Sequence, residues 1–224
     1  MSSGKLIVVD GTDGSGKATQ TKLLVEKLKK ENYDVEIIDF PRYGEKSAFL
    51  IEEYLNGKFG SAKETGPYVP SIFYACDRYV ASMKIKEWLK QGKIVIANRY
   101  VASSMAHQGG KIEDKEERDT FLEWLEDLEF NIFKIPKPTA NIILYVPPEI
   151  GQKLVDKKGH RDYVNGSKRD LHEEDLEHLK DATKTYRTLI EKYNWIVIEC
   201  APDNKLKTIE EIQKLLWDKA KDLL

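Results

Sequence analysis

The chain has 224 residues, of which 41% are hydrophobic and 33% charged, the balance of an ordinary soluble globular protein. The 36 basic and 38 acidic residues leave a net charge of −2, which excludes the overall basic excess typical of proteins that bind DNA or RNA. This length allows one α/β domain with a buried core. The two widely separated cysteines are expected to be reduced thiols. The apolar run near the N-terminus is too short for a signal peptide or a membrane span, so we expect a cytoplasmic protein with no membrane partner.

Five short apolar runs predict buried parallel strands, and segments with helical periodicity separate them. Such runs, which lack alternation, are typical of a sheet covered on both faces. The last helix is expected at residues 205–223, where Thr208 and Glu211 have capping-box spacing. The order predicts one three-layer α/β domain over residues 1–224, with helices on both faces and ligands beyond the carboxyl ends of the strands. The predicted strands are residues 6–9, 35–38, 94–97, 142–146 and 196–198.

Residues 11–17 read Gly-Thr-Asp-Gly-Ser-Gly-Lys, follow the first predicted strand and open a predicted helix at 17–31. This is G-x-x-x-x-G-K in the context that a phosphate-binding loop (P-loop) requires. The glycines let backbone N–H groups point at phosphate oxygens, and the helix N-terminus adds a partial positive charge. Lys17 is expected to reach the β- and γ-phosphates of ATP. The predicted ATP-binding residues are Gly11, Asp13, Gly14, Ser15, Gly16, Lys17, Ala18 and Thr19.

The P-loop departs from its usual pattern at the residue after the lysine. That position normally holds Ser or Thr, whose hydroxyl ligates Mg²⁺, and here it is Ala18. Thr19 cannot be assumed to replace it, because one step along a helix turns the side chain by about 100°.

Three arginines, Arg42, Arg78 and Arg99, fall at or near the predicted carboxyl edge of the sheet. A nucleoside monophosphate carries about two negative charges, and arginine forks bind phosphate bidentately. A single surface arginine is usually solvated or paired with a carboxylate. Three of them at ligand-facing positions beside a P-loop predict a phosphorylated acceptor.

Further motifs accompany the P-loop: F-P-R-Y-G at 40–44, F-Y-A-C-D-R at 73–78, N-R-Y-V-A-S-S at 98–104, A-H-Q-G-G at 106–110 and V-P-P-E at 146–149. Together they resemble the thymidylate kinase family over essentially the whole chain. The resemblance implies a P-loop NTPase fold with a five-stranded parallel sheet and a lid segment. It also implies Mg²⁺ with ATP as the phosphoryl donor, dTMP as the acceptor in dTTP biosynthesis, no nucleic acid polymer as partner, and a homodimer.

The resemblance assigns roles to the acceptor side. Arg42 and Arg99 would hold the acceptor phosphate, and Arg78 would lie along the base and phosphate. Tyr74 stands where the family stacks an aromatic ring on thymine, and Asp13 would accept from the sugar 3′-hydroxyl. The predicted acceptor-binding residues are Asp13, Phe40, Pro41, Arg42, Tyr43, Phe73, Tyr74, Arg78, Asn98, Arg99, Ser103, Ser104 and His107.

Two of these positions bear on specificity. Ser104 stands where the family often has Asn, Gln or Thr at the base edge, which weakens the argument for base reading. His107 matches an aromatic that crowds the sugar 2′ position and favours deoxyribose. A hydrogen-bonded histidine lining a pocket wall is the alternative interpretation of His107.

Residues 157–175 are rich in charge and follow the fourth predicted strand. They fit either a solvated surface loop or a mobile lid, which we place at about 155–175. The family needs an arginine on the transferring phosphoryl group, in the P-loop or in the lid, and this P-loop has none. The resemblance therefore points to Arg161 first and Arg169 second, as catalytic residues beside Lys17 and Arg99.

The second departure is Asn98, where the family has an aspartate that helps hold the metal. With Ala18, both usual protein contacts to Mg²⁺ are altered. Because Mg²⁺ keeps several waters and leans on substrate phosphates, we expect ATP to hold most of it, with Asn98 and Asp10 placing its waters.

Three other interpretations remain at this point. Ser104 and His107 allow a kinase with a different or broader nucleoside monophosphate acceptor. Ala18 and Asn98 allow a nucleotide-binding homologue with impaired catalysis. A polynucleotide-binding P-loop protein is disfavoured, because the chain lacks a net basic surface and the size of a helicase core. The large apolar residues of the predicted helices 68–91 and 115–133 could form core or a dimer interface.

Overall fold

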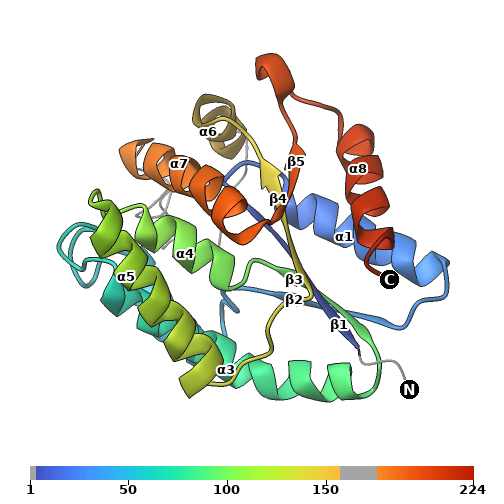
Figure 1. Ribbon diagram of the computed structural model, residues 1–224, viewed down its shortest axis with the longest axis horizontal. Helices are drawn as coiled ribbons and strands as arrows, with labels where there is room; N and C mark the ends of the chain where they lie inside the picture. Colours follow the sequence, from blue (N-terminus) through green and yellow to red (C-terminus); the bar gives the residue numbers. More distant parts are fainter. Residues whose placement is uncertain (1–3, 157–175) are drawn as a thin grey trace.

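The structure, a computed structural model, describes residues 4–156 and 176–224. Its centre is a sheet of parallel strands in the order β2-β3-β1-β4-β5 (Figure 1). All five predicted strands are confirmed, with bounds that differ by at most two residues. The strands are β1 (Lys5–Gly11), β2 (Val35–Asp39), β3 (Ile94–Asn98), β4 (Ala140–Tyr145) and β5 (Ile196–Glu199).

Strand β1 is buried on both faces because two hydrophobic layers cover the sheet. Leu6 and Val8 point into one layer, and Ile7 and Val9 point into the other. The first layer lies under α3 (Tyr68–Lys90), α4 (Val101–Gly109), α5 (Lys115–Glu126) and α7 (Leu176–Tyr193). The second lies under α1 (Lys17–Lys30) and α8 (Ile209–Lys221), on the opposite side of the sheet in Figure 1. The predicted three-layer α/β arrangement is therefore confirmed.

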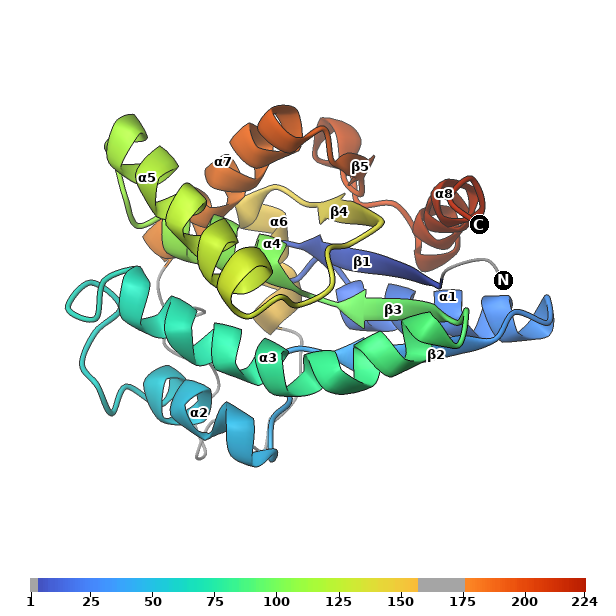
Figure 2. The ribbon, with the colours of Figure 1, turned by 60° about the horizontal axis from the view of Figure 1, so that its bottom comes forward.

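A small helical unit follows β2 and lies on the side of α3 that faces away from the sheet (Figure 2). It consists of a 3₁₀ turn at Lys46–Ala48 and helix α2 (Phe49–Leu55). Its buried side chains pack against Phe73 and Tyr74 of α3 and form a separate apolar cluster. This unit encloses one side of the cavity described below. After β4 the chain continues into α6 (Pro148–Asp156), and a 3₁₀ turn at Pro202–Asn204 follows β5.

Two helices differ from the expectation. The last one starts at Ile209 rather than at 205, because Thr208 caps it: its Oγ1 accepts from the N–H of Glu211 at 3.2 Å, and Glu211 accepts from the N–H of Thr208 at 2.7 Å. The predicted helix 115–133 is α-helical only to Glu126 and continues as a π-helix, Asp127–Ile132. The wider turn carries Glu129 into the interior, where it is fully buried.

Two simpler expectations concern the cysteines and the membrane. Cys76 and Cys200 are both free thiols, as predicted. Within residues 4–156 and 176–224, no helix combines the length and the apolar character needed to cross a bilayer.

Candidate active site

A cavity of about 410 Å³ opens at the carboxyl edge of the sheet. This is the edge where parallel α/β sheets bind ligands, and the volume suits a small molecule. Its walls come from the P-loop, the ends of β2 and β3, and the helices α2, α3 and α4. The lining residues are Asp13, Gly14, Gly16, Lys17, Ala18, Thr19, Asp39, Phe40, Pro41, Tyr43, Leu55, Tyr74, Arg78, Asn98, Arg99, Tyr100, Ser103, Ser104, His107 and Gln108.

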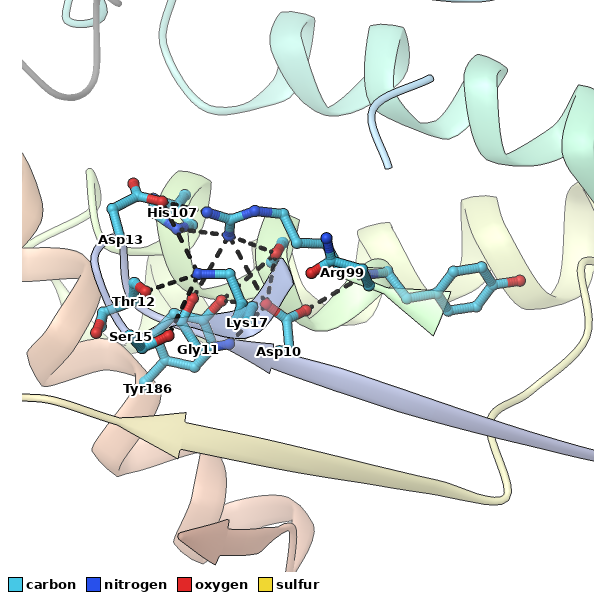
Figure 3. A network of polar contacts seen from close by, with 12 residues as sticks. Asp10, Gly11, Thr12, Asp13, Ser15, Lys17, Arg99, His107 and Tyr186 are labelled. Carbon is cyan, nitrogen blue, oxygen red and sulfur yellow. Dashed lines mark hydrogen bonds and ion pairs between the residues drawn. The ribbon is translucent and has the colours of Figure 1, made fainter. Parts of the chain in front are cut away.

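The P-loop wraps tightly between β1 and α1. Gly11 has a φ of 139°, and a Cβ there would lie 2.2 Å from the carbonyl oxygen of Leu144, so only glycine fits. Lys17 is the first residue of α1, and its ammonium donates to the carbonyl oxygen of Thr12 at 2.6 Å. The same ammonium lies 4.0 Å from Asp13 Oδ1 (Figure 3). The loop and its lysine thus face the cavity together.

Asp10 anchors the loop from below (Figure 3). Its Oδ1 accepts from the N–H of Gly11 at 2.8 Å, from Ser103 Oγ at 2.7 Å and from Tyr186 Oη at 2.8 Å. The N–H of Tyr100 donates to its Oδ2 at 3.3 Å. Asp10 is fully buried and is not among the cavity-lining residues. The structure therefore places this predicted metal residue beneath the P-loop, in a structural network.

Tyr186 of α7 was not predicted as a site residue, and it is the partner that completes this network. Burial, together with the charge of Asp10, raises the pKa of its phenol well above the ordinary value. The phenol therefore stays protonated and donates to Asp10. No motif marks this tyrosine, because its partner lies 176 residues earlier in the chain.

Arg99 lies in the cavity wall beside the P-loop. Its backbone is left-handed with a φ of 65°, a strained conformation for a side-chain-bearing residue. Its guanidinium forms an ion pair with Asp13 and donates to Ser103 Oγ at 3.0 Å. Burial alone would lower its pKa, but Asp13, Tyr186, Asp10 and Tyr43 raise it, so the side chain remains charged. Asp13 and Arg99 therefore hold one another at the centre of the cavity.

His107 lies beside this pair. Its Nε2 is 3.5 Å from Arg99 Nη1, and its Nδ1 is 3.5 Å from Nε2 of His178 on α7. Burial, with Arg99 and His178 nearby, holds the pKa of His107 well below its ordinary value. The ring is therefore neutral near pH 7 and lines the cavity wall.

Arg42 forms hydrogen bonds with Asp77 of α3 and is not among the residues that line the cavity. Its Nε donates to Asp77 Oδ1 at 3.0 Å, its Nη2 donates to Ser47 Oγ at 2.7 Å, and its backbone N–H donates to Asp77 Oδ2 at 3.0 Å. Asp77 is 1% exposed. It thus fixes the loop after the cis Phe40–Pro41 bond against the helix that also carries Arg78.

Arg78 is buried, and one edge of it lines the cavity. Its Nε donates to Glu129 Oε1 at 2.9 Å, and its Nη2 donates to Ser104 Oγ at 3.0 Å and also pairs with Glu129. Two buried charges with several shared hydrogen bonds hold a fixed geometry. The π-helix therefore supplies the carboxylate that orients this arginine.

The two predicted aromatic residues of α3 separate in the structure. Tyr74 lines the cavity, whereas Phe73 packs against Phe59 with ring centroids 5.6 Å apart and is not a lining residue. Of the two, only Tyr74 is therefore available to a ligand in the cavity. Ser104 lines the cavity as well, with its hydroxyl already engaged by Arg78.

The end of the cavity near the start of α1 has oxygen donors that suit Mg²⁺. Asn98 Nδ2 donates to Asp39 Oδ1 at 2.8 Å, and Asn98 Oδ1 is buried without a hydrogen-bond partner. Amide and carboxylate oxygens are ligands that Mg²⁺ prefers. In the described ranges, no group of three or more His, Cys, Asp or Glu side chains could hold a metal ion. These residues fit a magnesium ion bound mainly by nucleotide phosphates.

The predicted catalytic arginines Arg161 and Arg169 lie outside the described residues, as does the predicted lid apart from the last residues of α6.

Comparisons with known proteins agree with this geometry. A sequence model of the family described as thymidylate kinase matches residues 9–212. The chain belongs to the thymidylate kinase family. It is 28% identical over 197 residues to the thymidylate kinase of Mycobacterium tuberculosis, which covers 86% of this chain and 90% of that protein. It is 29% identical over 216 residues to that of Exiguobacterium sp., with 95% and 97% covered.

The fold is likewise that of a thymidylate kinase. The solved structure of the Candida albicans thymidylate kinase superposes with a TM-score of 0.72 at 21% identity, covering 98% of this chain and 92% of that one. The fold class and family inferred from the motifs are therefore confirmed. Asp39, Asp77 and Glu129 join Tyr186 as residues of the site to which the motifs assigned no role. Asp39 had a signal, since it directly follows a predicted strand and so falls at the ligand edge.

Proposed function

We propose that this thymidylate kinase family member transfers the γ-phosphoryl group of ATP to dTMP in the cytoplasm, with Mg²⁺ as cofactor. The observation that carries the proposal is that Lys17 and the phosphate-binding loop face the same cavity as Arg99, Arg78 and Tyr74. The cavity thus has a donor end, formed by the P-loop and Lys17, and an acceptor end, formed by Arg99, Arg78 and Tyr74.

At the donor end, the P-loop N–H groups and Lys17 bind the phosphates of ATP. The Lys17 ammonium exchanges its contact with the Thr12 carbonyl for phosphate oxygens. When bound, Mg²⁺ would neutralise charge on the transferred phosphoryl group, and Asn98 would contribute its amide oxygen to holding the ion. Transfer is direct, so positioning and charge stabilisation supply the rate without a covalent intermediate.

At the acceptor end, Arg99 binds the monophosphate while remaining charged. Asp13, released from Arg99 by that phosphate, accepts a hydrogen bond from the sugar 3′-hydroxyl. Tyr74 stacks on the base, and Arg78 presents an edge that Glu129 holds in place. Arg42, fixed by Asp77, adds positive charge behind the acceptor phosphate. The arginine that stabilises charge on the transferring group is assigned to Arg161, with Arg169 as the alternative.

An acceptor screen with ATP and Mg²⁺ tests the proposal. Turnover of dTMP should exceed turnover of dUMP, dGMP and UMP, because the motifs match the thymidylate kinase family and His107 stands where that family has an aromatic that crowds the sugar 2′ position. A preference for a purine would contradict the assigned acceptor. Nucleotide binding by calorimetry without turnover at any Mg²⁺ concentration would instead identify an impaired homologue.

We propose further that the protein forms a homodimer through α3. This helix carries a stripe of exposed apolar side chains, with Val80 and Met83 each 52% exposed. Contiguous exposed apolar surface marks an interaction site. The remaining members of the stripe are Val69, Ile72 and Tyr79.

The oligomeric state of a charged variant tests this second proposal. Val80→Asp should halve the mass measured by light scattering after gel filtration, whereas Val80→Ile, which keeps the apolar surface, should leave it unchanged. A wild-type protein that is monomeric at all concentrations would overturn the proposal.

A further inference from the structure

One carboxylate of the cavity stands out by its place in the sheet. Asp39 is the last residue of β2, and the parallel register pairs it with Asn98, the last residue of β3. Both residues line the cavity, together with Lys17 and Ala18 at the start of α1. The carboxylate therefore lies at the carboxyl edge of the sheet, in the cavity that Lys17 and Ala18 also line, one strand away from the position where the family has its metal-associated aspartate.

The charge of Asp39 is more available than that of the other aspartates at this edge. Asp10 is buried under several hydrogen bonds, and Asp13 is in an ion pair with Arg99. Asp39 is exposed, and Asn98 Nδ2 donates to its Oδ1 at 2.8 Å. Across residues 4–156 and 176–224, no lysine or arginine forms an ion pair with it. Its negative charge therefore faces the cavity without a cationic partner in that part of the chain.

Asn98 and Asp39 form one unit. An aspartate at position 98 would place two carboxylates face to face at hydrogen-bond distance, and their repulsion would disfavour the ionised pair. The amide removes this conflict because it donates to Asp39. Its own Oδ1 is left buried and unpartnered at the same place. The pair thus combines a neutral amide oxygen and an anionic carboxylate oxygen, both of the hard type that suits Mg²⁺.

We infer that Asp39 is the protein carboxylate that holds the Mg²⁺ of bound ATP, so that the negative charge usually found at the end of β3 has moved to the end of β2. This inference rests on the proposed function for the identity of the nucleotide. It explains how the chain accommodates both Ala18 and Asn98: the metal loses one hydroxyl and one carboxylate, and gains a carboxylate from the neighbouring strand.

Binding of the non-hydrolysable analogue AMP-PNP, measured by calorimetry with and without Mg²⁺, tests the inference. In the wild type, Mg²⁺ should tighten binding. In Asp39→Asn, the factor by which Mg²⁺ increases the affinity for AMP-PNP (the Mg²⁺-dependent gain) should fall by about tenfold, as it does when other groups that orient a metal are removed. The affinity for AMP-PNP without Mg²⁺ should not fall. Asp34→Asn is the matched control, because Asp34 precedes the same strand at its opposite end and is 70% exposed.

The exchanged double variant, Asp39→Asn with Asn98→Asp, makes the test sharper. It keeps one amide and one carboxylate in the pair, so the Mg²⁺-dependent gain should return to within a few-fold of the wild type. An unchanged Mg²⁺-dependent gain in Asp39→Asn would overturn the inference. It would also be overturned if the exchanged variant had the melting temperature of the wild type but the same reduced Mg²⁺-dependent gain as Asp39→Asn. The test measures binding and not turnover. If the wild type failed to phosphorylate dTMP, the proposed function would be wrong, but the binding data would still show whether Asp39 holds Mg²⁺.

Discussion

The two ends of the cavity are built in different ways. At the acceptor end, each of the three predicted arginines already has a carboxylate partner within the protein, so its geometry is set before a nucleotide arrives. At the donor end, Ala18 offers no hydroxyl, and Asn98 offers no charge. The acceptor end is thus preorganised by protein, while the donor end leaves much of its charge neutralisation to Lys17 and the metal. The acceptor pairs are Arg42–Asp77, Arg78–Glu129 and Arg99–Asp13.

Removing the lysine should break the donor end most severely. Lys17→Ala takes away the one cation of the P-loop, and we expect kcat to fall by about 10³-fold or more, since charge stabilisation supplies most of the rate. Steady-state assays with dTMP and ATP measure this. Lys22→Ala, an exposed lysine on the same helix, is the control and should keep the wild-type rate. Equal effects of the two substitutions would contradict the assigned role.

At the acceptor end, the largest effect is expected on stability. Glu129→Ala leaves Arg78 buried without its counter-charge, and breaking such a pair costs about 3–5 kcal/mol in the free energy of unfolding. Urea denaturation measures the loss. Glu123→Ala removes an exposed glutamate of the preceding helix and should change stability by less than about 0.5 kcal/mol. A small effect at Glu129 would show that Arg78 is oriented by other groups.

Lys111, which binds Tyr54 of α2, is expected to make the stability of the fold depend on pH. Its ammonium donates to Tyr54 Oη and to the carbonyl oxygen of Gly66, both at 3.0 Å, and so ties α4 to the α2 unit. Burial lowers its pKa to about 7. Between that value and its unfolded pKa, the unfolded chain binds the extra proton, so stability rises with pH, by at most about 1.4 kcal/mol per unit.

Denaturation curves at pH 7, 8 and 9 test this slope. Lys111→Met removes the titrating group and should flatten the rise, with its largest advantage over the wild type at pH 7 or below. Parallel pH profiles for the two proteins would mean that the lysine stays charged in the fold.

The smallest effect is expected from restoring the missing P-loop hydroxyl at the donor end. Ala18→Ser restores the hydroxyl at an exposed position on the first turn of α1. One added hydrogen bond or ligand contact is worth about 1 kcal/mol, so the Mg²⁺ concentration for half-maximal AMP-PNP binding should fall by roughly fivefold. Titration calorimetry detects such a change. An unchanged midpoint would show that position 18 does not reach the metal.

The contiguous parts of the fold and the site could be predicted from the sequence. The strands follow from apolar runs, and the P-loop follows from spacing that local backbone geometry demands. The partners of the arginines could not be found this way. Asp77 is adjacent to Arg78 in the chain yet pairs with Arg42, and Glu129 reaches Arg78 only because a helix widens into a π-turn. Such pairings depend on tertiary packing, which leaves no periodic signal.

The metal end shows the same limit in another form. Asn98 was recognisable as a departure by comparison with the family pattern, but the compensating carboxylate lies on a different strand. Only the register that sets Asp39 opposite Asn98 connects the two positions, and register is a property of the assembled sheet.

The hydrogen bond from Tyr186 to Asp10 also has a consequence for the order of events during synthesis. Asp10, which supports the loop, and the phenol that completes its support are 176 residues apart. A nascent chain therefore carries the complete P-loop sequence long before it can form this last hydrogen bond to Asp10. The support that Tyr186 gives to the P-loop therefore becomes available only after α7 has left the ribosome and docked.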